Sequence, residues 1–277
     1  MKHIVKFFIG LICLIILVIL YSRYIGTSGI KTIEKSIKVS NLSDDFYGIK
    51  IVHITDIHYG RTTFEKDLKD LVKKINLTKP DIVVFTGDLF TNIKIDSKEY
   101  DKISSILNEI EASIGKYSII GDNDLDIYTT IMANAGFKDI SNTYELIYTK
   151  SSNYIMLSGI SSNIKDKTDI LEKMKSSNDF LINNKPNYSI LLMHEADYID
   201  KIDYSKYNLV LAGHSLNGQI RLTVIGGIIK QDGARKYLES EYELKNTKLI
   251  ISNGIGTYNY SYRLFNRPSF NLYRIIK

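Results

Sequence analysis

The stretch that decides the fold covers residues 51–58 and reads IVHITDIH. Its first four residues, apolar except for His53, form the pattern of a buried strand. Asp56 and His58 follow that strand directly, and both side-chain types bind divalent ions. In layered α/β folds the carboxyl ends of the strands line the ligand crevice. This stretch therefore predicts both a central strand and one corner of a metal site.

The same arrangement recurs further along the chain. Each time an Asp or His follows a short apolar run: Asp88 after 81–85, Asp122 after 117–120, His194 after 189–192 and His214 after 209–212. The chain has five histidines, and three of them belong to this set. We expect His53 to be a core residue or to lie behind the ligands. Each motif is common alone, but their joint placement predicts that five segments converge on one cleft.

Strand-like runs alternate with helical patterns from residue 50 onward. Thr62 and Glu65 resemble a capping box that opens a helix to about residue 76, and residues 98–114 show apolar spacing typical of a helix. The last third is rich in strands and glycine turns. Alternating strands and helices followed by strands predict an α/β layered fold.

The N-terminus carries an uncharged apolar run at residues 7–21, flanked by Lys6 and Arg23. About 20 apolar residues span a bilayer. A cleaved signal peptide is the alternative, but no small-x-small cleavage site follows the run, which favours an uncleaved anchor. Lys2 and Lys6 favour a cytoplasmic N-terminus, although Arg23 and Lys31 oppose it. We therefore expect a single-pass protein of the cell membrane with an extracytoplasmic domain.

These patterns divide the chain into an anchor at residues 1–25, a connector at 26–45 and one domain at 46–277. The connector includes a candidate edge strand at 37–39. Cys13, the single cysteine, lies in the anchor, so we expect no disulfide in the domain. The net charge is +5, but residues after 40 hold 30 basic and 30 acidic side chains. A neutral domain does not favour nucleic acid as a partner.

The motif set resembles the calcineurin-like metallophosphoesterase family. The family's pattern is Asp-x-His, Gly-Asp, Gly-Asn-His-Asp/Glu, a single His and Gly-His-x-His, and the resemblance covers essentially everything after residue 48. It is closest to the membrane-anchored bacterial phosphoesterases, whose Gly-Gly-Gln and terminal segments are partly matched by residues 218–222 and 252–268. The resemblance implies a layered αββα sandwich of the metallophosphoesterase type, preceded by one transmembrane helix.

The resemblance also implies a ligand set. Asp56 and His58 would hold a first metal, Asp88 would bridge two ions, and the second would take Asp122, His194 and His214. Oxygen and imidazole ligands suit one or two ions of Mn, Zn, Fe or Mg, and the sequence does not choose among them.

Three positions depart from the family pattern. Asp122 stands where Asn is usual, Asn123 replaces the His that would act as general acid, and Leu216 replaces the second His of Gly-His-x-His. If this segment is aligned to the family pattern one residue further along, Asn123 is the metal ligand and Asp124 stands at the position of the general acid. Asp124 and Asp126 could equally be solvated turn residues, and we favour that interpretation for Asp126.

The resemblance implies metal-dependent hydrolysis of a phosphoester or pyrophosphate bond, with a phosphorylated small molecule or a lipid-linked or envelope compound as substrate. The alternative is a non-catalytic or weakly active metal- or phosphate-binding envelope protein, which the departures at Asn123 and Leu216 favour. A purely structural anchor protein leaves the motif placement unexplained. Four arginines could meet a substrate phosphate, but we expect surface salt bridges or extended stems from them: Arg61, Arg221, Arg263 and Arg267.

Overall fold

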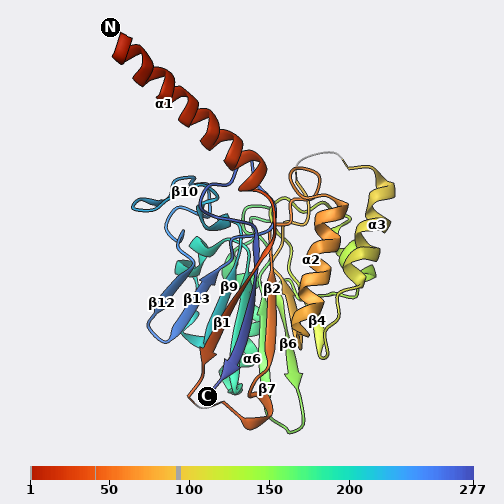
Figure 1. Ribbon diagram of the computed structural model, residues 1–277. Coiled ribbons are helices and arrows are strands. Elements are labelled where there is room, and N and C mark those ends of the chain that lie inside the picture. The colour runs from red at the N-terminus through yellow and green to blue at the C-terminus, as the bar shows by residue number, and fades with distance from the viewer. Residues whose placement is uncertain (1, 41, 92–94) are drawn as a thin grey trace.

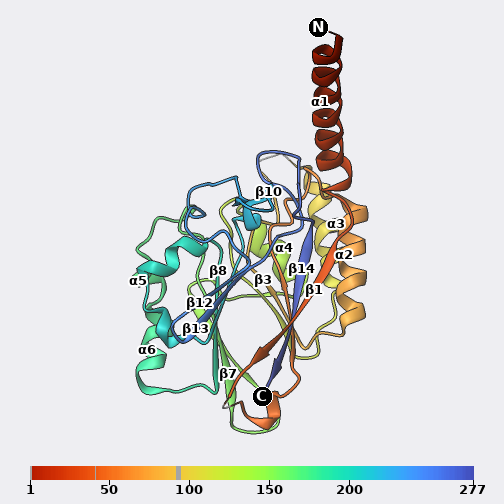
Figure 2. The ribbon, with the colours of Figure 1, turned by 60° about the vertical axis from the view of Figure 1, so that its left-hand side comes forward.

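A computed structural model describes residues 2–40, 42–91 and 95–277. Two six-stranded sheets pack face to face, helices cover both outer faces, and a long N-terminal helix projects from one end (Figures 1 and 2). The arrangement is the αββα sandwich that the motif set implies, and the expected fold class is confirmed.

The first sheet has the order β1-β14-β2-β3-β4-β5. Its strands β2 to β5 are parallel, β14 runs antiparallel to β2, and β1 pairs with β14 in parallel. The bounds are β1 Lys31–Lys38, β2 Lys50–Ile54, β3 Ile82–Phe85, β4 Gly115–Ser118, β5 Lys138–Asp139 and β14 Ser269–Ile276.

The second sheet has the order β12-β13-β9-β8-β7-β6. Its four inner strands are parallel, and an antiparallel strand lies at each edge. The bounds are β6 Thr143–Tyr148, β7 Tyr154–Gly159, β8 Tyr188–Met193, β9 Leu209–Ala212, β12 Glu241–Leu244 and β13 Thr247–Ile251. A short hairpin whose strands have two residues each lies outside both sheets: β10 Arg221–Leu222 and β11 Gly226–Gly227.

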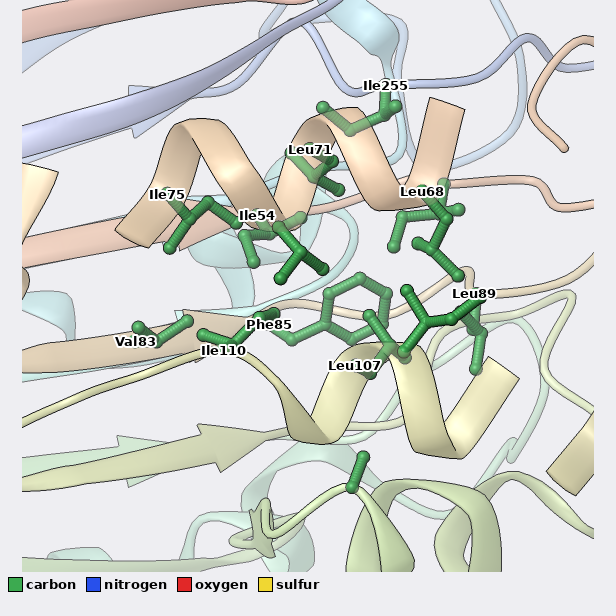
Figure 3. Close-up of a cluster of buried hydrophobic side chains, with 14 of the residues drawn as sticks. Ile54, Leu68, Leu71, Ile75, Val83, Phe85, Leu89, Leu107, Ile110 and Ile255 are labelled. Atoms are coloured by element: carbon green, nitrogen blue, oxygen red, sulfur yellow. The ribbon is translucent and has the colours of Figure 1, made fainter. Parts of the chain in front are cut away.

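Three apolar layers hold the sandwich together. One fills the space between the sheets, where Val84 and Ile119 meet Leu192 and Leu211. The other two lie under the helices of the outer faces. On the first sheet these are α2 Glu65–Thr78, α3 Ser97–Asn108 and α4 Tyr128–Asn134, and on the second α5 Ile170–Lys173 and α6 Lys175–Asn183. Figure 3 shows Leu71 of α2 packed over the strands beside Ile54 and Phe85.

The N-terminal helix α1 Lys2–Leu20 continues through a short π-helical segment, Tyr21–Ile25. Together they form a helix that is long and apolar enough to cross a membrane. None of the residues of α1 is buried against the domain. The helix stands clear of the sandwich in both ribbon views (Figures 1 and 2).

Some expected boundaries differ from the structure. Helix α2 begins after Phe64, whose N–H donates to Asp67, so the predicted capping box of Thr62 and Glu65 is wrong. Helix α3 ends at Asn108, short of the expected 114, because residues after it turn into β4. The edge strand expected at 37–39 runs instead from Lys31 to Lys38, inside the predicted connector.

A matched pair on α2 tests the packing of the first outer layer. Leu71 is fully buried, whereas Leu77 of the same helix is 74% exposed. We expect Leu71→Ala to lower the free energy of unfolding by about 2–5 kcal/mol, because it removes buried methyl groups and leaves a cavity. Leu77→Ala should stay within about 0.5 kcal/mol of the parent. Urea denaturation of the full chain in a neutral detergent measures both, and equal losses would contradict this packing.

Candidate metal centre

The loops after β2, β3, β4, β8 and β9 meet at the end of the sandwich from which α1 projects (Figure 1). They bring together the six side chains expected as ligands. Asp122 is partly exposed. The other five are at least 97% buried: Asp56, His58, Asp88, His194 and His214. The sequence therefore identified side chains that the fold does assemble in one place.

Four of these side chains form one group, which we call group two: Asp88, Asp122, His194 and His214. Asp122 Oδ1 lies 2.9 Å from His194 Nε2 and 3.0 Å from His214 Nδ1. Asp88 Oδ2 lies 3.4 Å from His194 Nε2. One potential ligand atom from each residue lies within 4.8 Å of all the others, so a single ion could contact all four.

Asp88 also belongs to a second group, group one, with Asp56 and His58. His58 Nε2 lies 3.5 Å from Asp56 Oδ1 and 3.7 Å from Asp88 Oδ2, which is too far for good hydrogen bonds. Both His58 Nε2 and Asp56 Oδ1 are buried and have no hydrogen-bond partner in the described structure. Buried polar atoms without partners are costly, so their convergence fits a divalent ion.

Each of the three histidines has one ring nitrogen fixed by a backbone carbonyl. His58 Nδ1 lies 3.1 Å from Phe90 O, and His194 Nδ1 lies 2.6 Å from Thr86 O. His214 uses Nε2 instead, 2.7 Å from the Asp232 carbonyl. A carbonyl only accepts, so each of these nitrogens donates and the opposite nitrogen faces the carboxylates. This is the support that histidine ligands of metals ordinarily have.

The backbone is unusual at the same positions. Asp56, His58, Asp88 and His214 all have positive φ, between 47° and 63°. Side chains other than glycine rarely adopt this left-handed region, although Asp, Asn and His tolerate it best. Such strain gathers at functional sites, where packing around the loop enforces it. Gly121 lets two loops touch, because a Cβ there would collide with Asp88.

The group-two histidines carry raised pKa values in the absence of an ion. Burial alone would lower the pKa of His214, but the hydrogen bond to Asp122 and its charge raise it to about 9. For His194, burial is likewise outweighed by Asp88 and Asp122, and its pKa rises well above the ordinary value. The same contacts lower the pKa of Asp122 against the opposing effect of burial.

Asn123 is tied into the carboxylate cluster. Its backbone N–H donates to Asp88 Oδ1 at 2.8 Å, and its side-chain Nδ2 donates to Asp88 Oδ2 at 2.7 Å and to Asp122 Oδ2 at 3.1 Å. An amide has no proton to transfer to a leaving group. In this structure the Asn123 side chain instead bridges the carboxylates of Asp88 and Asp122 through hydrogen bonds.

Asp124 is 1% exposed, which excludes the alternative of a solvated turn residue for it. Its carboxylate accepts from the backbone N–H groups of Gly121, Asp88 and Leu89 at 2.8–3.0 Å. These contacts place Asp124 behind the cluster, where it ties the loop after β4 to the loop after β3. Burial, together with the charge of Asp88, raises its pKa to about 7.

Leu216 is buried at the edge of group one. A Cβ placed on Gly254 would lie 2.5 Å from Leu216 Cδ2 and 2.8 Å from Asp56 Cβ, so the leucine packs close beside Asp56. An apolar group thus closes that side of group one. His53 lies behind the site, with Nε2 2.9 Å from the hydroxyl of Thr86, whose carbonyl holds His194.

Arg263 is fully buried, so the expected surface role is wrong for it. It donates to the carbonyls of Asn253 and Gly256 at 2.6–2.9 Å, and the Gly256 N–H in turn donates to Asp56 O at 2.7 Å. Sequence reasoning missed this supporting role, because nothing local distinguishes Arg263 from its neighbours. The other arginines pair near the surface: Arg61 with Asn259 O, Arg221 with Glu239 and Arg267 with Ser28 O.

The αββα fold and the clustered Asp and His side chains define a metal-dependent phosphoesterase scaffold. The calcineurin-like phosphoesterase family model matches residues 49–218. The chain belongs to this family, whose members are hydrolases that use divalent metal ions.

Curated relatives agree with this assignment. The chain is 29% identical over 260 residues to the uncharacterized metallophosphoesterase YkuE of Bacillus subtilis, covering 92% of this chain and 88% of that protein. It is 23% identical over 218 residues to the UDP-2,3-diacylglucosamine pyrophosphatase LpxG of Chlamydia trachomatis, covering 64% and 66%. Among solved structures, the NAD nucleotidase NadN of Haemophilus influenzae matches with a TM-score of 0.51 at 13% identity, over 75% of this chain and 45% of that one. That last likeness concerns the fold alone.

The raised histidine pKa values give a pH dependence for metal binding. His214 has a folded pKa of about 9 against 6.5 unperturbed, so its ion pair stabilises the metal-free protein fully below pH 6.5 and is lost as pH rises through 9. An ion must displace that proton. We expect affinity for Mn²⁺ to rise up to about tenfold per pH unit across this window. Calorimetric titration of the metal-free protein measures it, and a pH-independent affinity would contradict this electrostatic account.

Proposed function

We propose that the cleft holds two divalent ions and hydrolyses a phosphoester or pyrophosphate bond in a lipid-linked substrate at the membrane surface. The observation that carries the proposal is the buried Asp88, which belongs to both ligand groups at once. A carboxylate shared by two ions is the arrangement that a two-metal hydrolase needs. The unpartnered atoms of Asp56 and His58 support it on one side, and the four-residue group two supports it on the other.

The ligand types fit hard and borderline divalent cations, with oxygen from carboxylates and nitrogen from imidazole. Bound ions would supply positive charge for the phosphate oxygens and a water acidic enough to attack phosphorus. The chain's own residues position the site. Asp124 and Arg263 hold the loops that carry Asp88 and Asp56, and the backbone carbonyls fix the histidine rings.

Asn123 bears on the choice of substrate. Without a protonated side chain at this position, the leaving group must depart without that proton, and losing a general acid typically costs about 10²–10⁴-fold in rate. The loss is smallest for a leaving group that is already a weak base. A pyrophosphate bond, whose leaving group is itself a phosphate, meets this condition better than an alkyl phosphoester.

The proposed location follows from α1. The apolar helix leaves the sandwich at the same end as the loops that carry groups one and two (Figures 1 and 2). An anchored domain would therefore hold its cleft toward the bilayer rather than away from it. Relatives named pyrophosphatases of a diacylated nucleotide sugar support a lipid-linked substrate class for this chain. Lys2 and Lys6 before the helix support an extracytoplasmic orientation, whereas Arg23 and Lys31 after it oppose that orientation.

A second candidate function is a non-catalytic protein that binds a metal or phosphate in the same cleft. Leu216 favours it, because a packed leucine limits group one to three protein ligands.

Removal of the shared carboxylate tests catalysis. We expect Asp88→Ala to lower the rate of hydrolysis of a pyrophosphate-linked lipid by at least about a hundredfold, since even residues that only support ligands cost about 10–100-fold. Asp126→Ala is the matched control, because Asp126 is an exposed aspartate of the neighbouring loop. Chromatographic measurement of the two phosphomonoester products formed by the full chain in detergent with Mn²⁺ gives the rate. Equal rates for both variants and the parent would refute catalysis at this centre.

Restoring the family's histidines separates the two candidate functions. In a catalytic centre tuned to weakly basic leaving groups, Asn123→His with Leu216→His should accelerate alkyl phosphoester hydrolysis more than pyrophosphate hydrolysis. In a non-catalytic protein, both activities would start at background and rise together. The ratio of the two rates before and after substitution is the readout.

A further inference from the structure

A cavity of about 590 Å³ lies between the edges of the two sheets, beside the base of α1. Strands β1 and β14 line one side, and Ile251 of β13 lies on the other. Tyr21, directly after α1, and Phe265 also line it. None of the six side chains of groups one and two is among the described lining residues, so the cavity is separate from the metal centre.

At this cavity, the face of β1 and β14 that is apolar further along the strands carries polar side chains. Lys31 pairs with Ser269 and Ile33 with Asn271 along the two edge strands, whereas the same face further on carries Ile37 beside Ile275. Ile275 and Ile37 belong to the apolar layer between the sheets. Alternate residues of a strand share a face, so a lysine, a serine and an asparagine here occupy positions that are apolar further along.

Several polar atoms of the cavity lining lack partners. Arg267 Nε, Ser269 Oγ and Asn271 Oδ1 are buried and make no hydrogen bond in the described structure. Ser269 is 1% exposed and Asn271 is 3% exposed. Unsatisfied buried groups cost free energy unless a ligand or solvent meets them. Arg267 Nε and Ser269 Oγ can donate to a phosphate oxygen, whereas Asn271 Oδ1 only accepts and would need a hydroxyl group of the ligand or a water. Together these three atoms mark a built polar site.

The charge of the lining is positive. Lys35 pairs with Glu241, and Arg221 pairs with Glu239. Lys31 and Arg267 have no carboxylate partner among the described residues, which leaves two uncompensated cations. Arginine and lysine together with hydroxyl donors are the usual recognition set for phosphate.

The cavity lies where α1 joins the domain. The Arg263 N–H donates to Ser22 O at 2.9 Å, and Arg267 of the cavity lining donates to Ser28 O at 2.7 Å, so the segment that carries Arg267 is bonded to the chain at and just after the base of the helix. Phe265 on that rim is 68% exposed, and Val224 in the β10–β11 turn is 96% exposed. With α1 spanning a bilayer, these apolar side chains beside its base would lie at headgroup depth.

We propose that this cavity binds the phosphate-bearing headgroup of an anionic membrane phospholipid, apart from the metal centre. The inference rests on the proposed membrane anchoring but not on catalysis. The volume falls within the range of small-ligand sites, and juxtamembrane cations attract anionic lipid. A headgroup held between the β1–β14 edge and β13 would fix the tilt of the domain and keep the metal centre near the bilayer.

The test uses the full chain in a neutral detergent with EDTA, so that the metal centre cannot hold phosphate. Native mass spectrometry counts retained lipid. We expect one phosphatidylglycerol per chain, no phosphatidylcholine, and no displacement by inorganic phosphate at the same concentration as the lipid. Displacement by that phosphate would overturn the lipid assignment, and absence of retained phosphatidylglycerol would overturn the site.

Charge-matched variants separate the cavity from general attraction. Lys31→Gln with Arg267→Gln should weaken phosphatidylglycerol retention by at least about tenfold. Lys230→Gln with Arg235→Gln removes two exposed charges outside the cavity and should leave retention near the parent value. Equal weakening in both pairs would overturn the proposal.

The single variant Lys31→Gln guards against misfolding, since the Lys31 side chain makes no hydrogen bond or ion pair in the described structure. Its retention of phosphatidylglycerol should also fall. Hydrolysis with Mn²⁺ is measured separately on the same protein. Lipid retention tests only the cavity and the hydrolysis rate tests only the metal centre, so the two proposals can fail independently.

Discussion

The structure depends on one electrostatic constraint, the gathering of acidic side chains around the buried Asp88. Asp56, Asp122 and Asp124 all lie close to it, and like charges in a buried place repel strongly. Protonated histidines offset part of this in the metal-free protein, as the raised pKa values of His194 and His214 show. Backbone N–H groups offset another part at Asp124. Divalent cations complete the balance, because buried charges are tolerated when they are paired or coordinate metals.

The rest of the fold holds these charges in place. Parallel strands bring the loop residues to one edge, and the apolar layers between and outside the sheets prevent that edge from opening. Left-handed backbone at Asp56, Asp88 and His214 turns the side chains inward. Arg263 then secures the loop under Asp56 from the side of α1. The anchor junction and the metal centre thus share one supporting arginine.

The sequence predicted the features that are encoded locally. Asp56, His58, Asp88, His194 and His214 could be found because each follows an apolar run at the end of a strand, and parallel strand ends meet. The layered fold followed from the alternation of strands and helices. The start of α2 was misjudged because a backbone N–H of Phe64 is satisfied by Asp67, and Thr62 is not used as the cap.

Features made by contacts between distant segments could not be predicted. Arg263 supports Asp56 across more than two hundred residues of chain, and the cavity beside the base of α1 forms only where the β1–β14 edge faces β13. The role of Asp124 stayed open between alternatives, because its three backbone donors come from two loops that fold together. Local sequence patterns predict whether a residue lies in a strand, a helix or a loop, and whether it is buried. Contacts between distant segments form only in the assembled sandwich.

The central claim, that Asp88 is shared between two ions, is tested most directly by counting metal. The full chain, equilibrated with Mn²⁺ and freed of excess ion, is analysed by inductively coupled plasma mass spectrometry beside Asp88→Ala. The account predicts two ions per chain in the parent and a loss at both groups in the variant. A parent that retains no stoichiometric metal, or a variant that keeps both ions, would contradict it.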